Sequence, residues 1–170
     1  MYKDFEKLIR NKRKRKISVC IVILLIVLTT LFSFKMENGK EKKKSEVTLE
    51  IRCDELIDNP EKMAKPELWK YIPENGIILE ETKCTIETGK TVFDVLNRVC
   101  KEKDIQIEYS YTTGYDSYYV EGIQYLYEFD AGKRSGWIYR VDEKNTNYGC
   151  SQYKLKGGEK IVWEYVCDYK

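Results

Sequence analysis

The 170-residue chain contains no histidine. This absence excludes Ser-His-Asp and Cys-His catalysis, imidazole general-base chemistry near neutral pH, and zinc sites with histidine ligands. No Cys-x-x-Cys pair is present either, which disfavours a zinc site made of thiolates alone. We therefore expect no metal site, no catalytic residues and no covalently bound cofactor, and predict that the protein is not an enzyme.

Carboxylate chemistry is the enzymatic alternative that remains. Glu121, Glu128 and Asp130 have the side chains that acid–base catalysis requires. Nothing in the sequence places two of them together, and a solvated protein face explains them equally well. Buried, adjacent carboxylates would be needed to revive this alternative.

Excess positive charge is confined to the N-terminal part of the chain. Residues 1–16 carry eight Lys or Arg against two acidic residues, and residues 35–46 carry five against three. Residues 47–170 carry seventeen basic against twenty-three acidic residues. Because an acidic domain lacks the positive surface that binds phosphate groups, we expect no nucleic-acid partner.

One uncharged apolar run, residues 17–34, is long enough to cross a bilayer, at about 27 Å as a helix. A basic run at residues 11–16 precedes it directly, and the positive-inside rule places that run in the cytoplasm. We therefore predict a cytoplasmic basic tail (1–16), a single transmembrane signal anchor (17–34) and a solvated stalk (35–46). The predicted location is the cell membrane, with the C-terminal domain (47–170) extracytoplasmic.

A cleaved signal peptide is the main alternative to this anchor. Its apolar region would be shorter and would be followed by a small-residue cleavage site. Residues 32–36 (FSFKM) contain no Ala-x-Ala pattern, and Cys20 follows the wrong residue type for a lipoprotein site. These features favour an anchor that is not cleaved.

Hydrophobic periodicity divides the exported domain into one helix and several strands. Val47–Cys53 alternates apolar and polar residues, which predicts a first strand, and Thr82–Glu87 is predicted as the second. Residues 54–80 between them contain all three prolines and are predicted to be an irregular excursion with a short helix around Glu61–Tyr71.

A helix is predicted from Thr91 to about Lys103. Thr91 and Asp94 give it a capping-box-like start. Its apolar residues recur at helical spacing and form a face that must pack on a sheet, namely Val92, Leu96, Val99 and Cys100.

Short aromatic strands are predicted after the helix, at Ile105–Tyr109, Tyr118–Ile123, Tyr125–Phe129, Trp137–Val141, Tyr153–Leu155 and Ile161–Val166. Gly157-Gly158 is predicted to join the last two in a hairpin. One helix among many strands indicates an α+β fold in which the helix lies on one face of a sheet.

Five cysteines lie in the exported domain, which suits disulfides that reinforce a small core; the candidates are Cys53, Cys84, Cys100, Cys150 and Cys167. Two bridges would leave one thiol over and can be arranged in fifteen ways. Cys53 and Cys167 each lie six residues after the start of the first or last strand, so they would be level if these strands were parallel neighbours. Cys100 is equally well explained as a buried core thiol, with Cys84 and Cys150 as its alternative partners.

Twelve of the fourteen tyrosines fall within residues 105–170, and the densest stretch is residues 109–119. Tyrosine and tryptophan suit recognition surfaces, but they are also strong strand formers. For Trp137, Trp163 and Tyr165 we favour sheet packing. For the 111–119 loop, ligand contact and packing are equally good interpretations.

Four segments in this order resemble a known family: GKTVFDVLNRVCKE (89–102), YYVEGI (118–123), GWIY (136–139) and YKLKGGEKIVWEY (153–165). They resemble the small C-terminal domain of the transcobalamin and intrinsic-factor group, in the stand-alone form of bacterial surfaces. The resemblance implies a β-grasp-like fold with parallel first and last strands, which agrees with the pairing of Cys53 with Cys167.

The resemblance also implies cobalamin, or another corrinoid-like small molecule, as a non-covalent ligand. It places a set of aromatic residues near that ligand, namely Tyr115, Tyr118, Tyr119, Trp137 and Tyr139. Carriers of this group hold the corrinoid against a large helical domain that this chain does not contain. Binding would therefore require a dimer or a partner subunit. The alternative function is a cell-surface protein-interaction or structural module without a small ligand.

Overall fold

The computed structural model describes residues 23–30 and 44–169. The chain divides into two units, residues 1–42 and 43–170, which are described separately. In the first unit, residues 23–30 are helical and their large apolar side chains are exposed. No helix within the described ranges is long and apolar enough to span a membrane.

The predicted tail, residues 1–16, lies outside the described residues, as do most of the predicted anchor and stalk. The end of the predicted stalk is wrong: strand β1 (Lys44–Arg52) begins three residues before Val47. Lys44 and Ser45 pair with Glu87 and Ile86 of β2 (Ile77–Glu87). Backbone pairing with β2 extends β1 to residues that do not alternate between apolar and polar. Hydrophobic periodicity detects only the alternating part of a strand, so it missed these residues.

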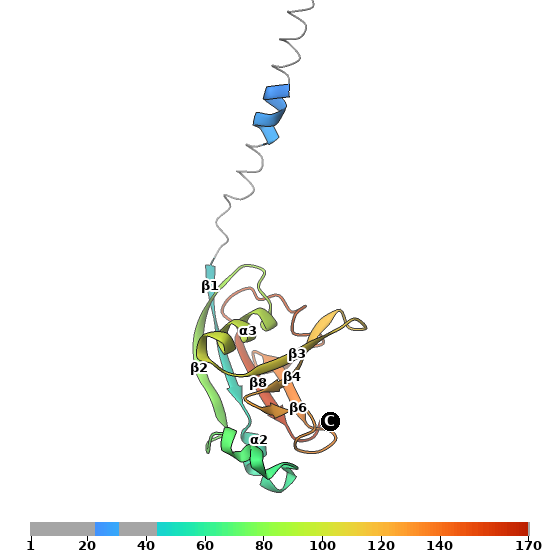
Figure 1. Cartoon of the computed structure of the whole chain (residues 1–170). Coiled ribbons are helices and arrows are strands. Elements are labelled where there is room, and N and C mark those ends of the chain that lie inside the picture. The colour runs from blue at the N-terminus through green and yellow to red at the C-terminus, as the bar shows by residue number, and fades with distance from the viewer. Residues whose placement is uncertain (1–22, 31–43, 170) are drawn as a thin grey trace, which may run out of the picture. The chain divides into compact units, whose positions relative to one another are not determined.

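The main sheet has five strands in the order β2-β1-β8-β6-β7, where β8 is Lys160–Val166, β6 is Gly136–Val141 and β7 is Lys144–Asn145 (Figure 1). β1 and β8 are parallel neighbours, which confirms the implied arrangement of the first and last strands. Leu49, and not Val47, lies opposite Ile161. The levels inferred for Cys53 and Cys167 are therefore wrong by two residues.

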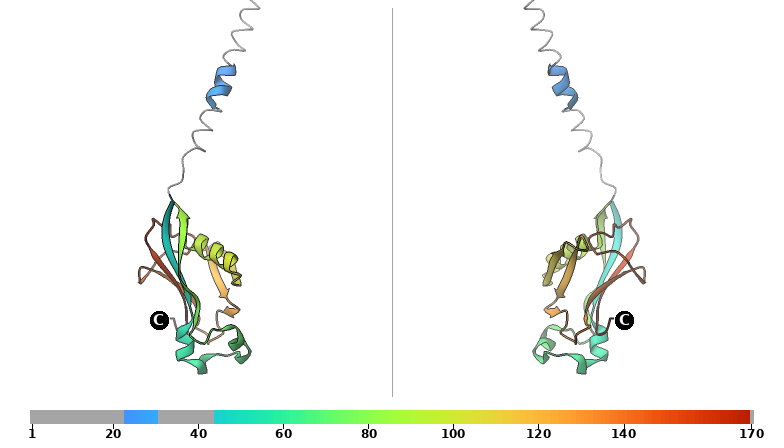
Figure 2. Two further views of the ribbon diagram at one scale, coloured as in Figure 1. Left: turned by 90° about the vertical axis from the view of Figure 1, so that its left-hand side faces the viewer. Right: turned by 90° about the vertical axis from the view of Figure 1, so that its right-hand side faces the viewer.

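A second sheet of three strands, β3 (Ile107–Thr112), β4 (Ser117–Ile123) and β5 (Leu126–Tyr127), lies with helix α3 (Val92–Lys103) on one side of the main sheet (Figure 2). The α+β class and the packing of α3 on a sheet are confirmed. The strands fall into two sheets instead of one, and β4 of the second sheet lies close to β6 of the main sheet.

Helix α3 begins as predicted. Thr91 accepts a hydrogen bond from the Asp94 backbone, and the Asp94 carboxylate accepts one from the Thr91 backbone. This reciprocal cap satisfies two backbone donors that would otherwise lack partners. The buried face of the helix includes every apolar residue named above, together with Phe93 and Val95.

Two predicted segments differ from the structure. Instead of one short helix around Glu61–Tyr71, residues 54–71 contain three helical pieces, α2 (Asp54–Asp58), η1 (Pro60–Lys62) and η2 (Pro66–Tyr71). Pro60 and Pro66 each start a new piece, which divides the segment. The hairpin around Gly157-Gly158 is absent among the described residues. Lys154 bridges to Thr91, and both long edges of β8 pair with β1 and β6.

The hydrophobic core lies entirely within residues 44–169. Alternate residues of β1 and β8 supply its centre, where Leu49, Ile51, Ile161 and Tyr165 are at most 1% exposed. Because every core residue among the described ranges belongs to this one unit, we expect the fragment 44–170 to fold on its own.

Candidate functional site

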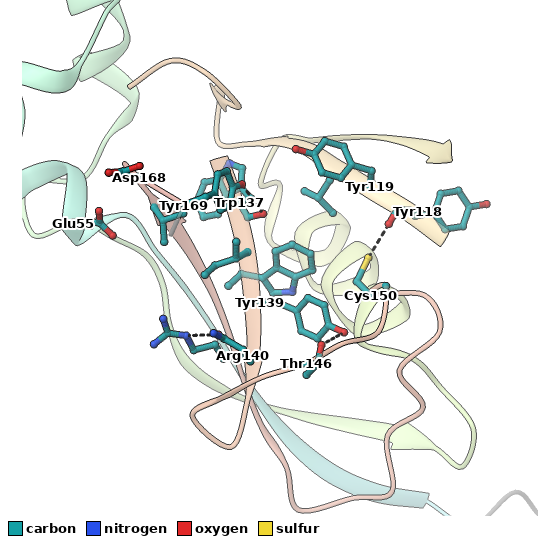
Figure 3. A pocket seen from close by; sticks show the side chains of 16 residues that line it. Glu55, Tyr118, Tyr119, Trp137, Tyr139, Arg140, Thr146, Cys150, Asp168 and Tyr169 are labelled. Atoms are coloured by element: carbon teal, nitrogen blue, oxygen red, sulfur yellow. Dashed lines mark hydrogen bonds between the residues drawn. The ribbon is translucent and has the colours of Figure 1, made fainter. Parts of the chain in front are cut away.

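A hollow of about 810 Å³ lies beside strands β4 and β6 (Figure 3). Its size falls within the range of small-ligand sites. The lining comes from β4, β6 and β8, the loop after β7, and the segment after β8; it includes Tyr118, Tyr119, Val120, Trp137, Ile138, Tyr139, Arg140, Thr146, Cys150, Trp163 and Tyr169.

The hollow meets strand edges and not a sheet face. Residues 137–140 of β6 and 118–120 of β4 line it consecutively. Successive side chains of a strand point to opposite faces, so only an approach from the edge touches all of them. Among the described residues, β7 pairs with β6 only at Arg140 and Val141, which leaves the edge of residues 136–139 without a neighbouring strand.

Trp137 and Tyr139 form much of one wall and are themselves held firmly. The indole N–H of Trp137 donates to Leu126 O at 2.8 Å, and its ring lies edge-on to Tyr165 at 5.3 Å. The Tyr139 hydroxyl donates to Tyr148 O at 2.6 Å and accepts from Thr146. Burial raises the pKa of Tyr139, so this hydroxyl stays protonated near neutral pH.

The other three of the four tyrosines predicted near the ligand have different surroundings. Tyr118 and Tyr119 line the hollow, but the Tyr118 ring stacks on Phe93 with centroids 4.4 Å apart. Figure 3 shows this ring directed away from the other labelled side chains. Tyr115 is 79% exposed in the turn before β4 and is not part of the lining. Four of the five predicted site residues therefore meet at the hollow, and Tyr118 contributes mainly backbone.

Tyr169 is a lining residue that the sequence analysis missed. Its backbone N–H donates to Arg134 O at 2.8 Å, and its hydroxyl donates to Trp137 O at 3.4 Å. The ring lies over Gly136, where an added Cβ would come within 2.4 Å of the Tyr169 hydroxyl oxygen. The glycine of the GWIY segment thus leaves room for the Tyr169 ring. Glycine at position 136 was the signal for this contact that the sequence offered.

Acidic groups gather at the same end of the hollow. The Tyr119 hydroxyl donates to Glu128 at 2.6 Å, and Glu55 and Asp168 line the rim. Burial, followed by Glu128, raises the pKa of Tyr119, while burial raises that of Tyr169 to about 12. Both phenols therefore act as neutral hydrogen-bond donors.

Two arginines near the hollow are paired with carboxylates. Arg134 lies 3.0 Å from Asp168, and Arg140 Nε lies 2.8 Å from Glu164, an ion pair without the alignment of a hydrogen bond. Glu55 and Glu128 have no such cation in the lining. The surroundings of the hollow therefore disfavour anionic ligands.

Trp163 lies deeper in the lining and is 2% exposed. Its indole N–H is buried and has no hydrogen-bond partner among the described residues. Such a group costs about 1–3 kcal/mol when it stays unpaired. The Trp163 ring packs against Tyr139, with centroids 5.4 Å apart and planes tilted by 35°.

All five cysteines of the domain are buried free thiols in the structure, so no disulfide is present among the described residues. Cys53 and Cys167 lie close enough to interact electrostatically, and their pairing stays a prediction. Burial raises the pKa of Cys53 and Cys100 to about 12 and that of Cys150 to about 11. Cys150 lines the hollow and donates to Tyr118 O at 3.2 Å.

Two of the three carboxylates considered for catalysis, Glu128 and Asp130, have structural partners. Asp130 lies 2.8 Å from Lys65 and accepts from the Tyr127 backbone, and Glu128 accepts from Tyr119. Within the described residues, no group of three or more side chains is placed to hold a metal ion. The arrangement is suited to holding a ligand through aromatic contact and neutral donors.

Comparisons with known proteins concern the same part of the chain. A family model described as a domain of unknown function (DUF4430) matches residues 89–166. A crystal structure of haptocorrin in complex with Cbi matches 75% of this chain with a TM-score of 0.56 and 15% identity. The match covers 26% of the haptocorrin chain, so this chain spans about a quarter of its length.

A weaker match is a protein from Ruminococcus gnavus ATCC 29149 described as a candidate metal binder. It has a TM-score of 0.43 and 10% identity over 74% of this chain and 99% of that chain, which is too low to support an argument. No curated protein matches. The haptocorrin match confirms the resemblance at the level of the fold.

Proposed function

We propose that the protein is a non-catalytic binding module that holds a small organic ligand in the hollow beside β4 and β6. The observation that carries this proposal is a hollow of about 810 Å³ lined by aromatic rings and an open strand edge. Aromatic side chains give a flat ligand large contact area at low entropic cost. The buried, satisfied hydroxyls and indole hold these rings in place before a ligand arrives.

Cobalamin or another corrinoid is the first ligand candidate. Its support is the fold shared with haptocorrin, which was crystallised with Cbi. One open hollow cannot enclose a ligand as large as a corrinoid, and small-ligand sites normally bury most of the ligand surface. We therefore propose that a partner subunit or a second copy covers the exposed side of the bound corrinoid.

The module is proposed to be anchored in the cell membrane with residues 44–170 outside the cytoplasm. Support comes from the uncharged run at residues 17–34 and the basic run directly before it. Protease added to intact cells should remove the domain and leave the N-terminal fragment in the membrane fraction. Recovery of intact protein in the soluble cytoplasmic fraction would contradict this location.

Titration of fragment 44–170 with cobalamin and with cobinamide tests the ligand. We expect saturable heat and a change in the corrinoid absorption spectrum at micromolar concentrations. Tyr139→Leu should weaken binding because it removes a wall of the hollow. Tyr115→Leu is the matched control, since this exposed ring is absent from the lining. Equal loss in both variants, or no binding at high micromolar concentrations, would refute corrinoid binding at this hollow.

The second candidate function is a protein-interaction module, favoured by aromatic side chains exposed outside the hollow. Tyr115, Phe129 and Tyr148 are 79%, 58% and 63% exposed. Crosslinking in intact cells should then yield one stoichiometric protein partner, and substitution of these rings should remove it. A chain that crosslinks to nothing would contradict this function.

A further inference from the structure

A second hollow, of about 640 Å³, lies between helix α3, the end of β2 and the first residue of β1, where these elements lie beside one another (Figures 1 and 2). Its charged lining consists of four cations and two carboxylates, namely Lys44, Lys90, Arg98, Lys101, Glu87 and Asp94. We call it the basic hollow. None of these six residues lines the hollow beside β4 and β6, so the two sites are separate.

The cations are brought together by helical spacing and by one contact between the helix and the sheet. Arg98 and Lys101 are three residues apart in α3, so they lie along the same side of the helix. Arg98 donates to Thr85 O at 2.8 Å, which holds this side of α3 against β2. Lys44 pairs with Glu87 across β1 and β2, and this pairing adds the first residue of β1 to the lining.

The positive charges of the basic hollow are accessible and only partly neutralised. The side chains of Lys90 and Arg98 are 48% and 44% exposed. Within residues 44–169, neither Lys44 nor Lys101 forms an ion pair, and both are exposed. Lys90 lies 3.7 Å from Asp94, whose carboxylate is already used by the cap of α3. The basic hollow therefore presents a net positive surface to solvent.

This positive surface contrasts with the rest of the domain and lies where the N-terminal part of the chain joins it. Residues 44–170 carry eighteen basic and twenty-four acidic residues. Lys44 is the first residue of the domain that the structure describes. Residues 35–43, which separate it from the predicted anchor, can span at most about 30 Å. A membrane that holds the anchor would therefore keep the basic hollow close to its surface.

We propose that the basic hollow binds the phosphate groups of anionic phospholipids and thereby docks the domain on the membrane that holds its anchor. This inference rests on the proposed anchoring and adds the surface of the domain that faces the lipid. Each lysine or arginine near an anionic membrane surface strengthens binding about fivefold. The short tether favours lipid over a soluble anion, because it raises the effective concentration of headgroups at the basic hollow. The acidic remainder of the domain is repelled by the same surface, which selects this orientation.

The test uses the full chain in nanodiscs of phosphatidylcholine, with or without phosphatidylglycerol. A neutral reagent acylates exposed lysines, and mass spectrometry gives the rate at each position. We expect phosphatidylglycerol to slow the acylation of Lys44, Lys90 and Lys101 about fivefold, because a bound headgroup shields each amine. Lys133 and Lys144 are the controls, since both are exposed and neither lines the basic hollow.

Equal rates in the two kinds of nanodisc, or equal slowing of the two control lysines, would overturn the inference. Inorganic phosphate added to the phosphatidylcholine nanodiscs separates lipid from a soluble anion, and equal slowing by phosphate alone would also overturn it. Lys101→Gln should reduce the slowing at Lys44 and Lys90, whereas Lys133→Gln should leave it unchanged. Equal effects of these two variants would contradict a site at the basic hollow.

The same nanodiscs separate this inference from the proposed function. A chain that stays outside the nanodiscs contradicts the anchor and this inference together. A chain that enters them without lipid-dependent acylation keeps the anchor and overturns only the docking surface. Titration with cobinamide tests the hollow beside β4 and β6 independently, because that hollow shares no lining residue with the basic hollow.

Discussion

The contact between Gly136 and Tyr169 predicts that Gly136→Ala destabilises the protein when Tyr169 is present and stabilises it when Tyr169 is replaced by alanine. An alanine Cβ at position 136 would lie 2.4 Å from the Tyr169 hydroxyl oxygen and 3.3 Å from the ring carbon that carries it. Gly136 has no positive φ, so the backbone itself accepts alanine. Gly136→Ala must therefore act by displacing the Tyr169 ring from the end of the hollow.

The expected magnitude follows from what the displaced ring loses. A half-buried tyrosine ring forfeits about 100 Å² of apolar burial, or about 2.5 kcal/mol, and its hydrogen bond contributes about 1 kcal/mol. Replacing glycine by alanine in a strand returns about 0.5–1 kcal/mol through the unfolded state. Gly136→Ala should therefore lower the free energy of unfolding by about 2.5–3 kcal/mol when Tyr169 is present.

In a Tyr169→Ala background the same substitution has nothing to displace. It should then raise the free energy of unfolding by about 0.5–1 kcal/mol. Urea denaturation of fragment 44–170, monitored by tryptophan fluorescence, gives the free energy of unfolding of the wild type, the two single variants and the double variant. We expect a coupling energy of about 3.5 kcal/mol. Equal destabilisation in both backgrounds would show that the strand itself rejects alanine and that the steric reasoning is wrong.

Three further properties of the fragment can be measured. With the protein kept reduced at pH 8, iodoacetamide should modify Cys53 and Cys100 about a thousandfold more slowly than in urea, because burial raises the pKa of each from 9.0 to about 12; equal rates by mass spectrometry would contradict this. Thr91→Ala should cost about 1 kcal/mol by thermal melting through loss of the capping box, whereas Thr91→Ser should restore it. Burial raises the pKa of Tyr165 above its unfolded value near 10, so the stability it contributes is complete below pH 10 and falls as pH rises further; Tyr165→Phe should flatten this fall, and an unchanged slope would contradict the assignment.

Features that depend on local pattern were predictable from the sequence. The capping box of α3 requires only Thr91 and Asp94 at the correct spacing, and the structure contains it. The alternation from Val47 onward marks core residues such as Leu49 and Ile51, and both are fully buried. In each case the residues that decide the structure lie within one turn or one strand.

The structure of the hollow depends on contacts between distant segments, which local pattern does not report. Tyr118 and Tyr119 are adjacent, so their side chains leave β4 on opposite faces, and only the presence of Phe93 decides which ring is committed to packing. Tyr169 was missed for the same reason. Its position depends on Arg134 and Gly136, more than thirty residues earlier in the chain.

The pairing along the edge of β6 shows where a ligand would find backbone groups that no neighbouring strand covers. The strand turns alternate backbone groups away from β8, so those of Trp137, Tyr139 and Val141 face the outer edge. Val141 pairs with Lys144 of β7, and the Trp137 carbonyl accepts from Tyr169. Both ends of the edge are therefore covered by the protein. Tyr139 lies between them and lines the hollow, so a ligand that reaches this point meets the backbone edge of β6 where β7 does not pair with it.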